Sequence, residues 1–165
     1  MRVALGADHR GRLTLEHVCG VLSKKSIKPV AVFHDRNAAA LDYTDVAYPV
    51  AVEVAAGRAE FGILICATGL GSSMAANKVP GVRAALVADE LTAGLARRCL
   101  NANTLCLGGH ALGPAQLRRI VTTFLDTAFE GSGRHARRLE KLQRIESGVF
   151  DTPLPVMANA DLKPA

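Results

Sequence analysis

Residues 61–75 read FGILICATGLGSSMA, and this stretch decides the fold of the chain. A short apolar run ends on Cys66, and a loop of small residues that contains Gly69 and Gly71 follows it. An apolar run of this length is typical of a strand that is buried on both faces of a parallel sheet. The glycines and hydroxyl residues after it predict a turn into a helix, so the stretch indicates a strand followed by a helix.

The same alternation runs through most of the chain. Short apolar runs predict five strands, at residues 3–7, 29–33, 62–66, 82–88 and 104–107. Helical periodicity appears between and after these runs, at residues 13–24, 43–56, 72–77, 91–98 and 114–128. Strands that alternate with helices in this way form a parallel sheet covered on both faces. The chain is therefore predicted to be an α/β protein with three layers, α/β/α.

A charged C-terminal helix and a tail follow this pattern. Residues 130–147 read EGSGRHARRLEKLQRIES, in which Leu139, Leu142 and Ile145 form a narrow apolar stripe. Such a stripe needs a second surface, which either this domain or a partner subunit supplies. Residues 148–165 contain three prolines and little periodicity, so an extended tail is predicted there. With 165 residues, 49% of them hydrophobic, residues 1–147 are expected to form one domain.

Composition excludes several classes of protein. The net charge of +5 permits nucleic-acid binding, but aromatic residues make up only 4% and tryptophan is absent, so a base-stacking platform is not expected. No apolar run approaches the ~20 residues that cross a bilayer. The four cysteines show no CxxC spacing and the chain opens without an apolar signal segment, which predicts a cytoplasmic protein with reduced thiols. The five histidines lack metal-ligand spacing, so no metal site is expected.

The loop after Cys66 has the composition of an anion cradle. Gly69 and Gly71 let the backbone approach a ligand closely, and free amides at the start of the next helix point toward negative charge. A cysteine beside such a loop is favoured as a thiolate, whereas the alternative is an ordinary buried core cysteine. A dinucleotide loop is a second alternative, in which Asp89 would bind ribose, although Met74 replaces the third glycine of the G-x-G-x-x-G pattern.

Two further groups of polar residues are candidates for ligand binding. Asp8 and His9 follow the first predicted strand, where Asp8 could alternatively cap a helix. Arg134 and Arg138 are spaced i, i+4, so both guanidinium groups could hold one phosphate, although a solvated basic face would have the same spacing.

Five motifs together resemble ribose-5-phosphate isomerase type B, a family that includes the galactose-6-phosphate isomerase subunits. They lie in order over residues 2–147: GADHRG at 6–11, LDYTD at 41–45, ILICATGLGSSMAANKVPGVRAAL at 63–86, NANTLCLGG at 101–109 and GRHARRLEKL at 133–142. The resemblance implies a Rossmann-like sugar-phosphate isomerase domain, active in a homodimer or homotetramer with shared active sites. It also implies a cofactor-free interconversion of ribose 5-phosphate and ribulose 5-phosphate through a cis-enediolate.

The resemblance also implies roles for individual residues. Cys66 would move the proton between C1 and C2, and Thr68 would serve the proton exchange between O1 and O2. The amides from Gly69 through Gly71 and Ser72 to Ser73 would hold the enediolate oxygen. Asp8 and Tyr43 would contact the sugar, and His9 would bind phosphate with Arg134 and Arg138 of the partner subunit. Asn77 and His110 are also expected to contact the substrate.

The chain departs from this family pattern in the expected substrate pocket. Residues 96–103 read ARRCLNAN, so that Cys99 stands where the family has a ring-opening histidine and Leu100 replaces its polar neighbour. His110 stands where many members have an arginine. A thiol is a poorer acid than histidine toward a ring oxygen. Either the substrate is already open-chain, such as a tetrulose 4-phosphate, or Cys99 or His110 opens the ring less well. A hexose 6-phosphate substrate and a non-catalytic binding subunit are the remaining alternatives.

Overall fold

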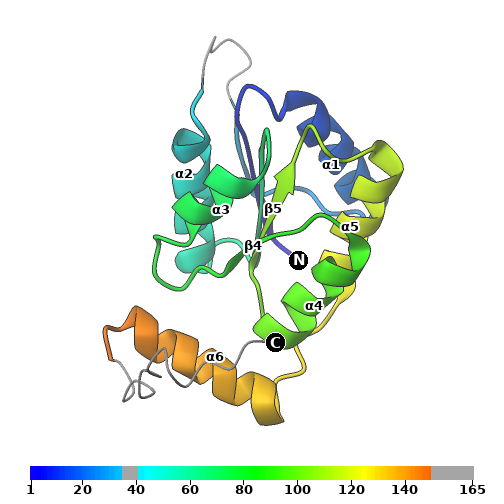
Figure 1. The fold of residues 1–165 in the computed structure, drawn as a ribbon. Helices are drawn as coiled ribbons and strands as arrows, with labels where there is room; N and C mark the ends of the chain where they lie inside the picture. The colour runs from blue at the N-terminus through cyan, green and yellow to red at the C-terminus, as the bar shows by residue number, and fades with distance from the viewer. Residues whose placement is uncertain (35–40, 150–165) are drawn as a thin grey trace, which may run out of the picture.

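The computed structural model describes residues 1–34 and 41–149, in which strands and helices alternate along the chain (Figure 1). The strands are β1 (Val3–Ala7), β2 (Ala31–Phe33), β3 (Phe61–Cys66), β4 (Ala84–Leu86) and β5 (Thr104–Gly108). The helices are α1 (Arg12–Lys24), α2 (Tyr43–Ala55), α3 (Leu70–Ala76), α4 (Glu90–Leu100), α5 (Pro114–Asp126) and α6 (Gly133–Glu146). The predicted α/β class and the five-stranded parallel sheet are confirmed.

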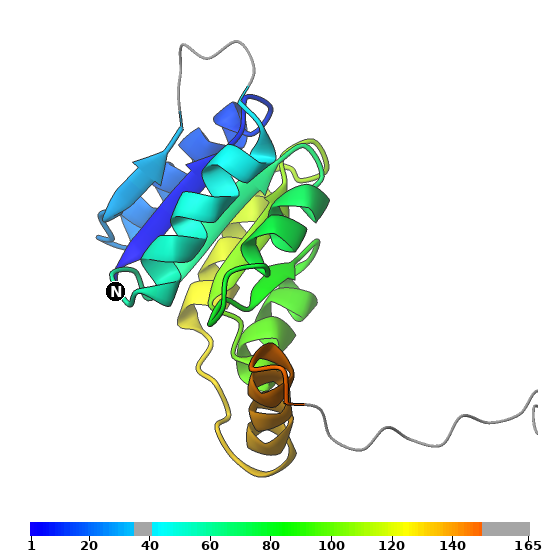
Figure 2. The same ribbon diagram turned by 90° about the vertical axis from the view of Figure 1, so that its left-hand side faces the viewer.

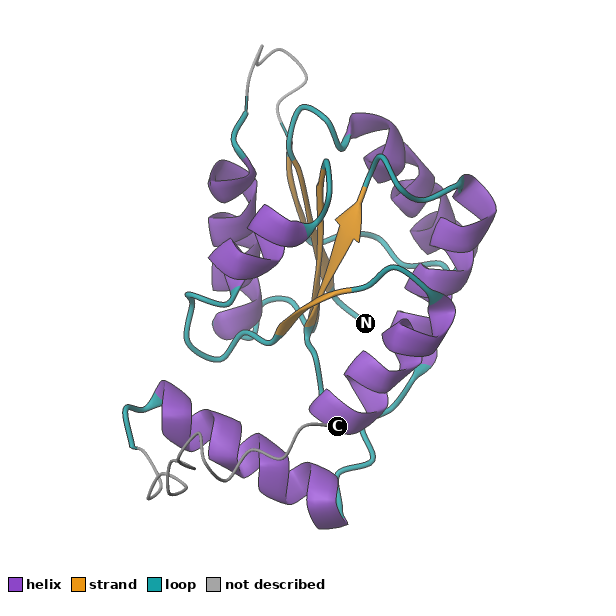
Figure 3. Cartoon of the chain, viewed as in Figure 1, coloured by secondary structure: helices purple, strands orange, loops and turns teal. Residues whose placement is uncertain are grey.

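The sheet lies between two layers of helices, as Figure 3 shows. Its strand order is β2-β1-β3-β5-β4, and every neighbouring pair is parallel. Helices α2 and α3 cover one face, and α1, α4 and α5 cover the other (Figure 1). The three-layer architecture follows from the alternation of apolar runs and helical periodicity in the sequence.

Successive residues of the central strands supply the two cores in turn. In β3, Ile63 and Ile65 belong to the core beneath α1, α4 and α5, whereas Leu64 belongs to the core beneath α2 and α3. This arrangement follows from the period of two in a strand, which sends alternate side chains to opposite faces. Cys106 of β5 lies in the second core, fully buried, and its burial raises the pKa of the thiol. Cys106 is therefore a core residue.

Strand β4 and helix α3 differ in length from the prediction. Strand β4 covers residues 84–86, not 82–88, and lies at the sheet edge, so few backbone groups there find a strand partner. Helix α3 begins at Leu70 and not at residue 72, because Gly69 has a φ of +79° and turns the chain into the helix directly after it.

Helix α6 projects from the end of the domain, as Figure 2 shows. Among its residues only His135 is buried. Leu142 and Ile145 of the predicted apolar stripe remain 47% and 55% exposed. The domain of the same chain therefore covers the stripe only in part.

Three further expectations from the sequence concern a membrane span, a metal site and the C-terminal tail. No helix within the described ranges is both long and apolar enough to cross a bilayer. Over the same ranges, no group of three or more His, Cys, Asp or Glu is arranged to hold a metal ion. The predicted tail at 148–165 lies, from residue 150 onward, outside the described residues.

Candidate active site

The strand order places a crevice at the carboxyl ends of β1 and β3. From β1 the chain passes to β2 at one edge of the sheet, and from β3 it passes to β4 at the other edge. The loops that leave these two neighbouring strands therefore diverge, which is the arrangement that binds ligands in open α/β sheets. Asp8 follows β1, and Cys66 is the last residue of β3.

A cavity of ≈ 270 Å³ occupies this crevice, which suits a small metabolite. Its lining combines the ends of β1 and β3 with the start of α2: Asp8, His9, Arg10, Leu41, Asp42, Tyr43, Cys66, Ala67, Thr68 and Gly71. Six of the residues predicted for the site therefore share one cavity: Asp8, His9, Tyr43, Cys66, Thr68 and Gly71. The other four lining residues were not predicted, because nothing in the sequence shows that a side chain in a turn or a backbone carbonyl faces a cavity: Arg10, Leu41, Asp42 and Ala67.

Cys66 has a hydrogen-bond donor directed at its sulfur. The backbone N–H of Gly69 donates to Cys66 Sγ at 3.0 Å. The side chain is buried, with 4% exposure, yet it lines the cavity. This hydrogen bond ties the sulfur to the loop that follows β3. Cys66 thus differs from Cys106, which lies wholly within the core and does not line this cavity.

Gly69 makes this hydrogen bond possible through its conformation. A Cβ at residue 69 would lie 2.5 Å from Leu86 Cδ1 and 3.0 Å from the carbonyl carbon of Leu107. With a φ of +79° in addition, the position admits only glycine without strain. The tight turn brings the amide of residue 69 back over Cys66.

The amides of the loop are not all available to a ligand. The N–H of Gly69 is bound to Cys66, that of Leu70 donates to Thr68 Oγ1 at 3.3 Å, and that of Ser73 donates to the Gly69 carbonyl at 3.1 Å. The amides of Gly71 and Ser72 have no hydrogen-bond acceptor among the described residues. The predicted set from Gly69 to Ser73 is thereby reduced to these two.

The two serine hydroxyls of α3 do not reach the cavity. Ser73 Oγ donates to the Leu70 carbonyl at 2.8 Å. Ser72 is fully buried, and its Oγ has no partner among the described residues. Any contact of these serines with a ligand would come from the backbone, and the Ser73 amide is already used.

Asp8 and His9 are held by backbone groups. Asp8 Oδ1 accepts from the amides of Arg10 and Gly11, each at 2.9 Å, so the carboxylate organises the turn after β1. Asp8 also faces the cavity, and therefore both alternatives drawn from the sequence apply to it. His9 Nδ1 lies 3.1 Å from the carbonyl oxygen of Leu41.

Tyr43 lies across the cavity at the first turn of α2. A Cβ at Gly71 would lie 3.0 Å from three carbons of the Tyr43 ring, so the ring packs directly on the glycine. The absence of a side chain at residue 71 thus fixes how closely α2 and α3 approach at the cavity.

Other predicted residues lie away from this cavity. Cys99 and Leu100 end α4, which runs back from the carboxyl edge of the sheet, and Arg134 and Arg138 lie on α6 at the same distant end (Figure 1). A single chain therefore does not bring these four residues to Cys66. His110 lies on the near side, with its amide donating to the Ala67 carbonyl at 3.2 Å.

Asn77, which is expected to contact the substrate, forms hydrogen bonds to the backbone of its own chain. Its Nδ2 donates to the carbonyls of Ser73 and Ala84, at 2.9 and 2.8 Å, and its Oδ1 accepts from the Ala84 amide at 2.9 Å. The side-chain amide is thus saturated by backbone groups. Asn77 joins the end of α3 to β4, and it lines a different cavity.

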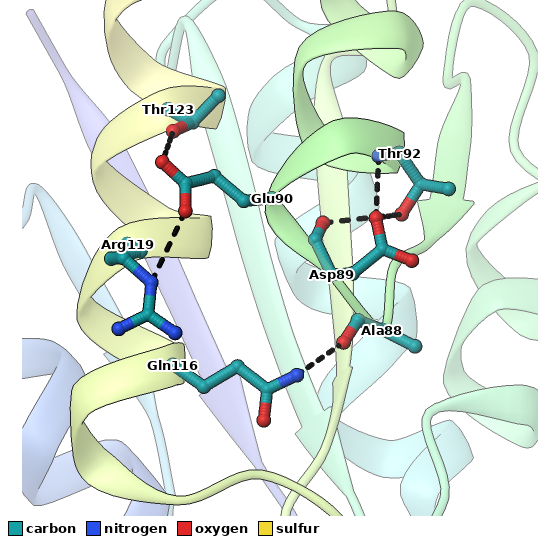
Figure 4. Close-up of polar contacts among 7 residues, drawn as sticks. All are labelled: Ala88, Asp89, Glu90, Thr92, Gln116, Arg119 and Thr123. Carbon is teal, nitrogen blue, oxygen red and sulfur yellow. Dashed lines mark hydrogen bonds and ion pairs between the residues drawn. The ribbon is translucent and has the colours of Figure 1, made fainter.

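Asp89 caps helix α4, as Figure 4 shows. Its Oδ1 accepts from the Thr92 amide at 2.7 Å and from Thr92 Oγ1 at 3.0 Å. These hydrogen bonds lower the pKa of the Asp89 carboxyl. Glu90 beside it pairs with Arg119 of α5 at 3.1 Å (Figure 4). The Asp89 carboxylate is therefore occupied by the start of α4, and Asp89 no longer supports the alternative of a dinucleotide-binding loop.

Comparison with known proteins places the chain in a family. A model of the ribose/galactose isomerase family matches residues 3–142. The chain belongs to this family. In this member of the ribose/galactose isomerase family, the cavity lies where β1 and β3 end. The motif GADHRG begins at the end of β1, and ILICATG covers most of β3 and the loop after it.

Solved structures and curated relatives agree with the family. The type B ribose 5-phosphate isomerase of Trypanosoma cruzi is 42% identical, with a TM-score of 0.85 over 90% of this chain and 99% of that one. Ribose-5-phosphate isomerase B of Mycoplasma genitalium, solved with bound ribulose-5-phosphate, is 41% identical, with a TM-score of 0.80 over 88% and 96%. The D-erythrulose-4-phosphate isomerase of Pectobacterium atrosepticum is 34% identical over 86% of this chain and 93% of its own length.

Proposed function

We propose that this chain interconverts an aldose phosphate and a ketose phosphate, ribose 5-phosphate and ribulose 5-phosphate first among them, without a cofactor. The observation that carries the proposal is Cys66, whose sulfur accepts a hydrogen bond from the Gly69 amide at 3.0 Å and lines a small cavity together with Asp8 and Thr68. Two type B ribose 5-phosphate isomerases share the fold at more than 40% identity, one of them with ribulose-5-phosphate bound, which supports this substrate class.

The proposed reaction moves one proton between adjacent carbons. The Cys66 thiolate removes the proton from C2 of the open-chain aldose, and the C–H electrons form the C1–C2 double bond of a cis-enediolate. The free amides of Gly71 and Ser72 donate to the oxygen that gains negative charge. Thr68 Oγ1, which accepts from the Leu70 amide at 3.3 Å, keeps its own hydrogen for exchange between O1 and O2. The thiol then returns the proton to C1, which regenerates the thiolate and gives the ketose.

We further propose a homodimer in which each active site is shared. Exposed apolar side chains gather around the β4 edge: Leu70 and Met74 on α3, Leu86 on β4, and Leu91 and Leu95 on α4. Leu86 approaches the Gly69 turn, so this patch adjoins the Cys66 loop. In the proposed dimer, a two-fold axis passes through the patch perpendicular to the strands, so the strands of the partner run in the opposite direction. The ends of the partner's α4 and α6 would then lie toward this loop. Cys99, Arg134 and Arg138 of the partner subunit would then complete the site.

Subunit mixing tests the shared site. Cys66→Ala and the double variant Arg134→Ala/Arg138→Ala are each expected to lose nearly all activity. Half of the dimers in a refolded equal mixture are hybrids, and each hybrid keeps one intact site, so about a quarter of wild-type activity should return. No recovery in a mixture that contains hybrid dimers would contradict the shared site.

A four-carbon open-chain substrate is the second candidate. Cys99 and Leu100 replace the residues that the family resemblance associates with ring opening, and one relative is a D-erythrulose-4-phosphate isomerase. A tetrulose 4-phosphate cannot close the furanose ring that a pentose 5-phosphate closes, so it needs no ring-opening acid. Isomerisation assays with four-, five- and six-carbon sugar phosphates decide between the candidates. Binding without turnover of any of them would support the non-catalytic alternative. The cytoplasmic location predicted from the cysteines stays part of this proposal.

A further inference from the structure

Arg10 is a charged residue of the cavity that the proposed reaction has not yet used. It follows Asp8 and His9 in the turn after β1 and lines the cavity together with Cys66 and Thr68. Among the described residues it is the one arginine or lysine in that lining, which also contains the carboxylates of Asp8 and Asp42. Without Arg10, the two carboxylates in the described part of this lining would repel a phosphate dianion.

The hydrogen bonds of His9 show which group near it can donate to an anion. The Leu41 carbonyl oxygen, 3.1 Å from His9 Nδ1, can only accept, so Nδ1 carries the hydrogen. His9 Nε2 is then the acceptor for Arg10 Nε, which lies 3.3 Å away. In this arrangement the imidazole has no remaining N–H to offer an anion. Donation to an anion falls instead to the guanidinium of Arg10.

The guanidinium has free donors. Its Nε is directed at His9, and neither Nη group has an acceptor within residues 1–34 and 41–149. No carboxylate of the same described ranges forms an ion pair with Arg10. An arginine with an unpaired fork at the wall of a cavity is suited to bind a phosphate through two parallel N–H donors.

The backbone beneath Arg10 is fixed, so its side chain starts from a defined position. The Arg10 amide donates to Asp8 Oδ1 at 2.9 Å. On the other side, a Cβ at Gly11 would lie 2.8 to 2.9 Å from side-chain and backbone atoms of Ile65, which shows how tightly the turn packs on β3. The Arg10 carbonyl oxygen would lie 3.5 Å from a Cβ at Gly109, so the turn also adjoins the loop that carries His110.

We propose that Arg10 is a phosphate-binding residue of this site. The inference rests on the proposed function, because it takes a sugar phosphate as the occupant of the cavity. The phosphate lies on the side of His9 and Arg10, and the reacting carbons lie toward Cys66. Arg10 supplies two charge-assisted hydrogen bonds and holds His9 in the tautomer that accepts from it. This chain thereby keeps a permanent positive charge on this wall of the cavity.

Calorimetric titration with inorganic phosphate tests Arg10 apart from catalysis. Arg10→Gln is expected to weaken phosphate binding by about tenfold or more, the loss of a charged hydrogen-bonding group. Arg10→Lys keeps the charge without the fork, so it should recover part of the affinity. Arg12→Gln is the matched control, because Arg12 lies two residues on, outside this cavity, and faces Glu16 at 3.9 Å. Its affinity should stay within about twofold of wild type.

Steady-state kinetics with ribose 5-phosphate provide the second readout. Arg10→Gln should raise KM by a factor similar to the loss of phosphate affinity and change kcat less, which a general loss of folding would not do. Equal phosphate affinities for Arg10→Gln and Arg12→Gln, or no phosphate binding by the wild-type protein, would overturn the proposal. Arg10-dependent phosphate binding in a protein that isomerises no sugar phosphate would support the role of Arg10 and refute the proposed function.

Discussion

Substituting Gly69 with alanine tests the turn that directs an amide at Cys66. The residue has a φ of +79°, and an added Cβ would lie 2.5 Å from Leu86 Cδ1 and 3.0 Å from the Leu107 carbonyl carbon. Leu86 can rotate, but the backbone of Leu107 cannot yield without moving β5. The loop is therefore expected to shift, and the Gly69 amide to move off the sulfur.

The expected cost has two components that a second glycine separates. Gly81 has a φ of +84°, and a Cβ there would meet nothing within 4 Å. Gly81→Ala carries only the left-handed backbone cost of about 1–2 kcal/mol. Gly69→Ala adds an overpacking cost of about 1–3 kcal/mol. The free energy of unfolding should thus fall by about 2–5 kcal/mol in the first site and by the smaller amount in the second.

Urea unfolding at one fixed protein concentration measures the difference. With an m-value near 2 kcal/mol/M, the unfolding midpoint of Gly69→Ala should lie about 0.5–1.5 M below that of Gly81→Ala. Adding Leu86→Ala to Gly69→Ala should recover part of this gap, because it removes the nearest contact. Isomerase activity should fall sharply in Gly69→Ala and persist in Gly81→Ala. Coincident midpoints with retained activity would refute the account of the turn.

Two other substitutions probe the helix start after β4 and the departure from the family pattern. Asp89→Ala should lower the Tm at pH 7, because the helix cap is lost. Hydrogen bonds from Thr92 lower the pKa of the Asp89 carboxyl, so the stabilisation by the cap is complete above the ordinary pKa of 3.8. It is lost as the pH falls through the lowered pKa. Thermal unfolding scans of the two proteins should converge toward about pH 2, and a constant difference would contradict the cap. The double variant Cys99→His/Leu100→Asn should raise turnover on ribose 5-phosphate, measured as the rate at which ribulose 5-phosphate forms. An unchanged rate would show that ring opening does not limit turnover.

The three-layer arrangement of the fold was predictable from the sequence. Buried parallel strands are nearly continuous apolar runs, and the run that ends at Cys66 was identified within one residue. Strand β4 was placed less well, because an edge strand of three residues has too little apolar pattern to define its ends. The start of α3 depended on the backbone conformation of Gly69, which composition alone does not reveal.

The candidate site was predictable where chemistry follows a strand directly. Asp8 directly follows β1 and Cys66 ends the neighbouring β3, and the structure places both at one cavity. Asn77 is expected to contact the substrate, whereas in the structure its side-chain amide binds the backbone of Ser73 and Ala84. Arg10 was missed, since nothing in the sequence distinguishes an arginine that faces a cavity from one that faces solvent.

Proton exchange in deuterated water tests most directly whether Cys66 is the base. Wild-type protein incubated with ribose 5-phosphate should incorporate deuterium at C1 of the ketose and at C2 of the recovered aldose, as NMR detects. Cys19→Ala removes a thiol on α1, outside the cavity, and should exchange at the wild-type rate. Cys66→Ala should give no exchange above buffer while it still binds the sugar phosphate. Exchange by Cys66→Ala at the wild-type rate would contradict the central claim.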